Sequence, residues 1–186
     1  STPIKSSAAS DVYKRQTKDM AECKNIMVYV ETAEGNPVKV GLEMLSPAKK
    51  LADKVTAVVI GGGVADAAKE VAKAGADQVI CVDSEDYKEF NLDAYAQVLV
   101  ELVKEENPEA VFVGGTQDGK DIAPVVAAKC NTGCASDVLD IKAEDGEVIY
   151  TCPLYGGTVL EDVKIKTTPQ IATLRSGAVS YTHLTL

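Results

Sequence analysis

The order of the predicted elements constrains this fold most, because a strand precedes a helix four times in succession. Apolar runs predict strands at residues 25–30, 55–60, 78–82 and 111–113, and helical spacing of apolar residues predicts helices at 42–52, 67–72, 92–107 and 119–130. The run at 55–60 is apolar throughout, which suits a strand that is buried on both faces. Consecutive strand-helix units favour parallel strands. We therefore expect an α/β fold with three layers, αβα, around a mostly parallel, Rossmann-like sheet.

The last third of the chain changes to strands alone. Strands are predicted at residues 138–142, 148–152, 158–165 and 171–174, with a turn at Asp145-Gly146. We expect these C-terminal strands to extend the sheet, partly in antiparallel orientation. Their order stays open, because hairpin and crossover connections both fit the sequence.

Both ends of the chain differ in character from its middle. Residues 1–19 and 180–186 show no periodicity, and the stretches SSAASDVYKRQ and SYTHLTL resemble translated sequencing-adapter sequence. We expect both ends to be non-native or disordered segments around one native domain at residues 20–179, which can start at Met20. The only histidine, His183, lies in the tail. Serine triads, two-histidine metal sites and histidine acid-base catalysis would therefore lack a member, and no catalytic or metal-binding residue is predicted.

Composition argues against several classes of partner and location. A formal charge of −9 disfavours nonspecific binding to nucleic acid or to anionic membranes. No apolar run approaches the roughly 20 residues that cross a bilayer. Five cysteines at scattered positions, without a secretory signal, favour a reduced, cytoplasmic location. Cys130 and Cys134 could suggest metal or redox work, but buried structural thiols are the better interpretation because no histidine or second cysteine pair accompanies them.

Ligands of a parallel α/β sheet bind at the carboxyl ends of its strands, and two of the loops there are rich in glycine. The first is the turn at Gly61, Gly62 and Gly63, with Asp83 at the end of the next strand, where a ribose-binding acid would stand. Asp66 occupies the position of the third glycine in the dinucleotide fingerprint. A side chain there would crowd the helix against the strand, so a plain strand-to-helix turn is favoured over an NAD site.

The second loop, at residues 114–121, has the spacing of a phosphate-binding loop but lacks the Ser or Thr that such a loop has at its last position. Asp121 stands where a Ser or Thr hydroxyl would coordinate magnesium, and Asp118 adds a second repelling charge. A weaker prediction is that the loop faces a nucleotide or a partner through Gly114, Gly115, Thr116, Gly119 and Lys120. The acidic stretch at residues 83–89 is either a docking surface or, more commonly, a solvated loop.

Short motifs along the whole domain carry a family resemblance. They are Gly114-Gly115, GKDIAP at residues 119–124, Ala127-Ala128, Thr132-Gly133, Ala135 with Asp137, Tyr155-Gly156-Gly157 and PQIATLR at residues 169–175. Together with NIMVYVE at 25–31 and GLEMLSPAKKLAD at 41–53, they resemble the N-terminal domain of electron-transfer flavoprotein alpha subunits. Each motif alone is weak, but the set is specific.

The resemblance implies an adenine-nucleotide hydrolase-like sheet and a heterodimer with a beta subunit of similar fold. It also implies an FAD electron carrier that accepts electrons from acyl-CoA dehydrogenases in fatty acid beta-oxidation, or that takes part in NADH-linked bifurcation. In the family the FAD is held mainly by a C-terminal domain, so we expect this chain to act as a scaffold without binding the flavin itself. Two alternatives stay open: a stand-alone AMP- or ATP-binding module, and an NAD-dependent enzyme.

Overall fold

The computed structural model describes residues 23–144 and 146–177. The two segments predicted to be non-native, residues 1–19 and 180–186, lie outside the described residues, as do Met20 and His183. No helix within the described part is long and apolar enough to cross a membrane.

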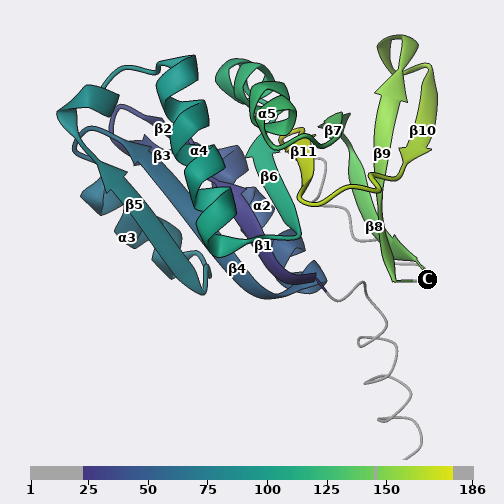
Figure 1. Ribbon diagram of the computed structural model, residues 1–186, viewed down its shortest axis with the longest axis horizontal. Coiled ribbons are helices and arrows are strands. Elements are labelled where there is room, and N and C mark those ends of the chain that lie inside the picture. The colour runs from purple at the N-terminus through teal and green to yellow at the C-terminus, as the bar shows by residue number, and fades with distance from the viewer. Residues whose placement is uncertain (1–22, 145, 178–186) are drawn as a thin grey trace, which may run out of the picture.

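Six parallel strands form the central sheet, in the order β5-β4-β1-β6-β11-β7 (Figure 1). Their bounds are Cys23–Tyr29 (β1), Ala52–Gly61 (β4), Gln78–Asp83 (β5), Ala110–Gly114 (β6), Cys134–Val138 (β7) and Gln170–Leu174 (β11). The chain runs outward from β1 to β5 and then returns to the other side of β1 at β6. The strand order therefore reverses between β1 and β6, where ligands of such sheets commonly bind.

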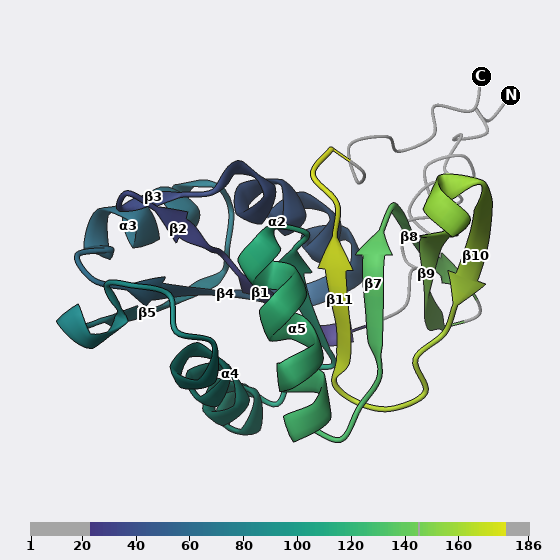
Figure 2. The same ribbon diagram turned by 90° about the horizontal axis from the view of Figure 1, so that it is seen from above.

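Helices cover both faces of the sheet, which confirms the three-layer prediction (Figure 2). Helices α2 (Lys39–Leu51) and α3 (Ala65–Lys73) pack on one face, and α4 (Leu92–Glu106) and α5 (Gln117–Lys129) on the other. Alternate residues of β1 serve the two cores, since Ile26 and Val28 pack with α2 while Met27 and Tyr29 pack with α4 and α5. This alternation follows from the twofold side-chain period of a strand.

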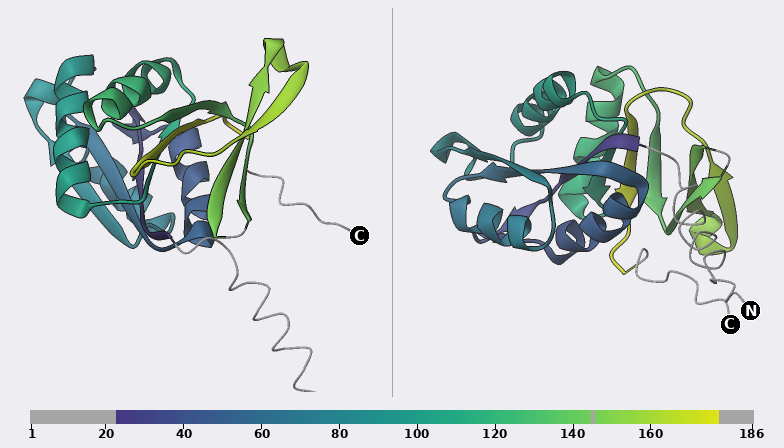
Figure 3. Two further views of the ribbon diagram at one scale, coloured as in Figure 1. Left: turned by 45° about the vertical axis from the view of Figure 1, so that its right-hand side comes forward. Right: turned by 90° about the horizontal axis from the view of Figure 1, so that it is seen from below.

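The C-terminal strands extend the main sheet only in part: β11 joins it as expected, whereas three others do not. Strands β8 (Asp140–Glu144), β9 (Glu147–Leu154) and β10 (Val159–Val163) form a separate antiparallel sheet beyond β7 (Figure 3). The strand predicted at 138–142 is two strands, because the chain leaves the main sheet after Val138. After β10 the chain returns, and β11 inserts as a parallel strand between β6 and β7.

Two short pieces complete the rim above the carboxyl ends of the strands. A hairpin of β2 (Thr32–Ala33) and β3 (Asn36–Pro37) follows β1, and a 3-10 turn, η1 (Glu85–Tyr87), follows β5. A second 3-10 turn, η2 (Tyr155–Gly157), joins β9 to β10. The first two pieces border the cavity that is described below.

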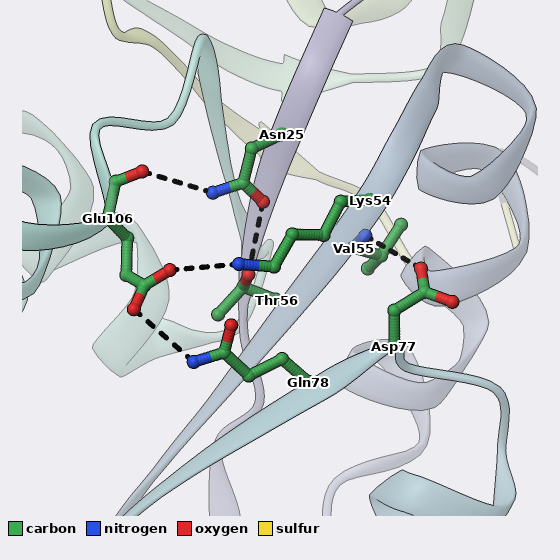
Figure 4. A network of polar contacts seen from close by, with 7 residues as sticks. All are labelled: Asn25, Lys54, Val55, Thr56, Asp77, Gln78 and Glu106. Carbon is green, nitrogen blue, oxygen red and sulfur yellow. Dashed lines mark hydrogen bonds and ion pairs between the residues drawn. The ribbon is translucent and has the colours of Figure 1, made fainter.

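At the opposite edge of the sheet, a polar network satisfies the amino ends of the strands (Figure 4). The fully buried Thr56 donates to Asn25 Oδ1 at 3.0 Å, and Asn25 donates to the Glu106 carbonyl at 3.3 Å. The Glu106 carboxylate also accepts from Lys54 at 3.1 Å and from Gln78 at 3.3 Å. Because each buried polar group here has a partner, we assign the network to stability.

Candidate functional site

A cavity of about 440 Å³ opens at the carboxyl ends of β1 and β4. The β2-β3 hairpin, the turn after β4, the segment at η1 and the first turns of α4 and α5 surround it. The lining combines aromatic, acidic, basic and small side chains: the aromatic residues Tyr29, Tyr87, Phe90 and Tyr95; the acids Glu31, Glu34 and Asp118; one base, Lys88; and the small or aliphatic residues Thr32, Gly35, Ile60, Gly61, Gly62 and Val64. This is the place where a doubly wound sheet offers a ligand site.

Glu31 ties the end of β1 to the start of α5. The Thr116 hydroxyl donates to the Glu31 carboxylate at 2.5 Å and accepts from the Gly119 amide at 2.9 Å, so that Thr116 caps the helix. Burial raises the pKa of Glu31; the hydrogen bond from Thr116 opposes this shift, and the nearby charge of Asp118 adds to it. A carboxyl group at the edge of the cavity is therefore held in a partly desolvated position.

Asp83, the candidate ribose-binding acid, closes the first glycine turn. Asp83 accepts a hydrogen bond from the Gly63 amide at 2.7 Å, and Ser84 donates its amide to the Gly61 carbonyl at 3.0 Å. A Cβ atom at Gly62 would lie 3.1 Å from Lys88 Cβ, so the segment at η1 covers the turn. A pyrophosphate would need those amides and that space. The geometry favours the plain turn over the NAD site.

The second glycine loop needs glycine at three positions because neighbouring atoms leave no room for a side chain. A Cβ atom would lie 2.7 Å from Val40 at Gly114, 2.9 Å from the Leu174 carbonyl oxygen at Gly115 and 1.9 Å from the Gly114 carbonyl oxygen at Gly119. The Gly115 amide donates to Leu174 at 2.7 Å. The loop thereby holds the start of α5 against β11 and α2.

Lys120 points to a charged cluster on the β7 side of the sheet, away from the cavity. Its ammonium lies 3.9 Å from Asp137 Oδ1, which also accepts from Arg175 Nε at 3.1 Å. Arg175 Nη2 bonds the other oxygen of Asp137, making the pair bidentate. Of the five loop residues singled out from the sequence, Gly114, Gly115, Thr116 and Gly119 therefore lie at the α5 start, and Lys120 contacts Asp137.

The five cysteines differ in burial, although the sequence predicted buried thiols. Cys23 and Cys152 are buried, Cys130 and Cys134 are half-buried, and Cys81 is exposed, so the prediction of buried thiols holds only in part. Burial raises the pKa of all five thiols, with that of Cys23 raised to about 11. Fewer thiolates at neutral pH mean lower reactivity. Within the described residues, no group of three or more His, Cys, Asp or Glu could hold a metal ion.

The acidic stretch at residues 83–89 forms part of the cavity rim. Ser84 caps η1 by accepting from the Asp86 amide, and Lys88 pairs with Glu85 at 3.5 Å. The Tyr87 carbonyl accepts from the Tyr95 hydroxyl at 2.6 Å, which fixes the segment to α4. The stretch is thus an ordered turn with a solvated outer side.

Sequence reasoning did not find the aromatic and acidic lining of the cavity. Tyr29 and Glu31 lie where β1 ends. Tyr87, Phe90 and Tyr95 lie in η1, in the connection after it and in α4, respectively. One sequence signal does indicate this site: Glu31 is a polar residue directly after a buried strand. That strand, β1, lies beside the point where the strand order reverses. The two loops predicted from the sequence are distinguished by their glycines instead.

A family model described as the electron transfer flavoprotein domain matches residues 26–182 of this chain. That match includes the four strand-helix units, the small antiparallel sheet and β11. Both sheets therefore belong to a single family domain.

Curated relatives agree with the family model. Protein FixB of Clostridium saccharobutylicum is 36% identical over 166 residues, which cover 86% of this chain and 49% of that protein. The electron transfer flavoprotein subunit alpha of Syntrophomonas wolfei is 38% identical over 150 residues, covering 81% and 47% respectively. The lactate dehydrogenase (NAD(+),ferredoxin) subunit LctC of Acetobacterium woodii is 32% identical over 164 residues, covering 84% and 39%. The chain thus spans about half the length or less of these relatives.

Proposed function

Because this chain belongs to the electron transfer flavoprotein domain family, we propose that it is the N-terminal scaffold domain of an alpha subunit in an electron carrier. In this proposal the domain pairs with a beta subunit of similar fold and does no redox chemistry itself. FAD belongs to the complete heterodimer and is held outside residues 20–179. Several relatives are named as electron-transfer subunits, which supports the electron-transfer role.

One observation carries the pairing. In the part of the chain that the structure describes, the large exposed apolar side chains all lie at one tip of the small sheet: Leu154, Tyr155, Val159 and Leu160. We call these four residues the hairpin patch. Tyr155 is 84% exposed and Leu160 is 60% exposed. Contiguous apolar surface of this kind commonly marks a protein interface.

The hairpin patch is also built to keep its shape without a partner. The Thr158 hydroxyl donates to the Tyr155 carbonyl at 2.9 Å, and Gly156 and Gly157 take positive φ values of 68° and 93°. Glycine adopts such angles without steric cost. A preformed apolar tip loses little conformational entropy on association, which favours binding.

Co-expression with the beta subunit tests the pairing. We expect the Tyr155→Asp and Leu160→Asp variants to lose co-purification, because a charge would be buried in the interface. Ala72→Asp is the control, since Ala72 is exposed on α3 at the far end of the molecule (Figure 1). Equal retention of the beta subunit by all three variants would contradict the role of the hairpin patch.

Flavin content tests the scaffold role separately. We expect the purified 186-residue chain to show no stoichiometric flavin absorbance. The heterodimer of a full-length alpha subunit and its beta subunit should show it. Flavin retained by the short chain after gel filtration would contradict the proposal.

The electron donor, an acyl-CoA dehydrogenase or a related dehydrogenase, and the cytoplasmic location belong to the same proposal. Reduction of the complete complex by candidate donors distinguishes among them.

The alternative of a stand-alone AMP- or ATP-binding module finds little support in the geometry. Lys120 pairs with Asp137, and Lys88, the one basic residue of the cavity lining, pairs with Glu85. Calorimetry with AMP and ATP still tests it, using Lys120→Ala. Gly115→Asp is unsuitable, because a Cβ atom at Gly115 would lie 2.9 Å from the Leu174 backbone and would disturb packing.

A further inference from the structure

Tyr29 presents an unused hydroxyl to the cavity. The side chain is only 2% exposed and lines the cavity, yet its hydroxyl has no hydrogen-bond partner among the described residues. The other buried tyrosines of the described part differ, since Tyr95 donates to the Tyr87 carbonyl and Tyr150 donates to Gln170 at 2.9 Å. No fully buried side-chain nitrogen or oxygen of the described residues lacks a partner, so the Tyr29 oxygen is open to the cavity. It can therefore form a hydrogen bond with a ligand that enters there.

The charges around that hydroxyl favour a cation. The lining has three carboxyl groups, Glu31, Glu34 and Asp118, against the one ammonium of Lys88, which is already paired with Glu85. Burial raises the pKa of Tyr29, and Tyr95, Glu31 and Asp118 add to the shift, which places both acids within electrostatic reach of the hydroxyl. An anion would meet repulsion here without a free counter-charge.

The rest of the wall suits an organic rather than an inorganic cation. The Tyr87 and Tyr95 rings are 5.6 Å apart at their centroids, and the Phe90 and Tyr95 rings 5.1 Å apart, both edge to face. Aromatic faces attract cations and also pack against apolar groups. A volume of about 440 Å³ lies in the range of small-molecule sites.

We propose that this cavity binds a small organic cation, a protonated amine on an aromatic or aliphatic body. The amine is held by Glu31, Asp118 and the Tyr29 hydroxyl, and the body lies against the rings of Tyr87, Phe90 and Tyr95. The site is independent of the proposed electron-transfer role, because it uses neither the hairpin patch nor a flavin. Its failure would leave that role untouched, and the reverse also holds.

Three matched probes test the charge preference on the 186-residue chain: benzylammonium, benzyl alcohol and benzoate, at one pH and one ionic strength. Amide chemical shifts followed by NMR give both the affinity and the location. We expect benzylammonium to shift the amides of Glu31 and Gly62 and to bind at least ~10-fold more tightly than benzyl alcohol. Benzoate should not bind. Equal binding of the three probes, or tighter binding of AMP than of benzylammonium, would overturn the proposal.

Two variants test the residues. Tyr29→Phe removes only the hydroxyl, and Asp118→Asn removes one charge; each should weaken benzylammonium binding by roughly 10-fold or more, as expected for a hydrogen bond to a charged group. Asp121→Asn is the matched control, because Asp121 lies one turn along α5, is exposed and does not line the cavity. Unchanged affinity in Asp118→Asn, or an equal loss in Asp121→Asn, would refute the site even if Tyr29→Phe did not fold.

Discussion

Single residues in this protein are decisive where the backbone comes close to itself. At the start of α5, the Thr116 hydroxyl accepts a hydrogen bond from the Gly119 amide. This cap holds the first turn of the helix close to the end of β6. A side chain at Gly119 has no room there, because its Cβ atom would lie 1.9 Å from the Gly114 carbonyl oxygen. The same capping turn positions Glu31 and Asp118 at the cavity.

Gly119→Ala should therefore destabilise the fold strongly. We expect a loss of about 3 kcal/mol or more in the free energy of unfolding, because the backbone must move to relieve the contact. Gly133→Ala is the control, since its Cβ atom would meet Ile165 only at an ordinary 3.4 Å. Urea unfolding of both variants measures the difference. A Gly119→Ala protein as stable as the control would show that the capping turn can open without cost.

Asn25→Ala tests the polar network at the amino edge. The change removes the acceptor of the buried Thr56 hydroxyl and the donor to the Glu106 carbonyl. An unpaired buried hydroxyl costs about 1 to 3 kcal/mol, so we expect a loss of that size in thermal or urea unfolding. Gln97→Ala, on the exposed side of α4, should change stability little. Thr56→Val in the Asn25→Ala background should recover part of the loss.

Among the elements, β7 and β11 depend on a charged pair at their carboxyl ends. Asp137 has a left-handed φ of 59°, and its amide donates to Thr173 on β11 at 2.8 Å. Its carboxylate binds Arg175, just after β11. The hydrogen bond from Arg175, aided by the charges of Arg175 and Lys120, lowers the pKa of Asp137 below its usual range.

The pair should make stability depend on pH in the acid range. Because the folded-state pKa is lowered, the contribution is fully present above the unfolded-state value of about 3.9 and is lost as the pH falls through the folded-state value. Asp137→Asn keeps the left-handed backbone accessible but removes the charge. We expect it to be less stable than the parent protein at pH 7, and we expect the difference to shrink as the pH falls below the unfolded-state value of about 3.9. Urea titrations across that range, with Asp121→Asn as the control, check this; a constant difference at every pH would contradict it.

At the scale of the whole molecule, the small sheet shares a core with the main one. Tyr150 on β9 is fully buried in the same cluster as Cys23, Ile26 and α2 residues, and its hydroxyl reaches Gln170 on β11. The chain also passes twice between the two sheets, after β7 and before β11. The two sheets should therefore unfold as one cooperative unit.

Tyr150→Leu tests that cooperativity. We expect a loss of a few kcal/mol from the poorer filling of the core. Amide hydrogen exchange should show equal loss of protection in β6 and in β9, because both open only on global unfolding. Tyr155→Leu should leave exchange unchanged, since Tyr155 is 84% exposed. Loss of protection confined to β8, β9 and β10 would show that the small sheet opens by itself.

Local sequence patterns are sufficient to predict the four strand-helix units and their parallel sheet. Each unit carries its own periodicity and its own turn, and these local signals agree with the tertiary structure. The strand at Ala52–Gly61 and the helix at Leu92–Glu106, for example, match the patterns at 55–60 and 92–107. The family resemblance, carried by motifs spread along the chain, was also determined at this level and is confirmed by the family model.

The order of the C-terminal strands and the cavity depend instead on contacts between distant parts of the chain. The insertion of β11 between β6 and β7, and the separate small sheet, depend on pairings between residues far apart in sequence, which leave no local signal. The same holds for the cavity. Tyr29, Phe90 and Asp118 carry no common motif, and they come together because parallel strands align their carboxyl ends at one edge of the sheet. Side-chain patterns specify elements, whereas sites arise from how those elements are placed.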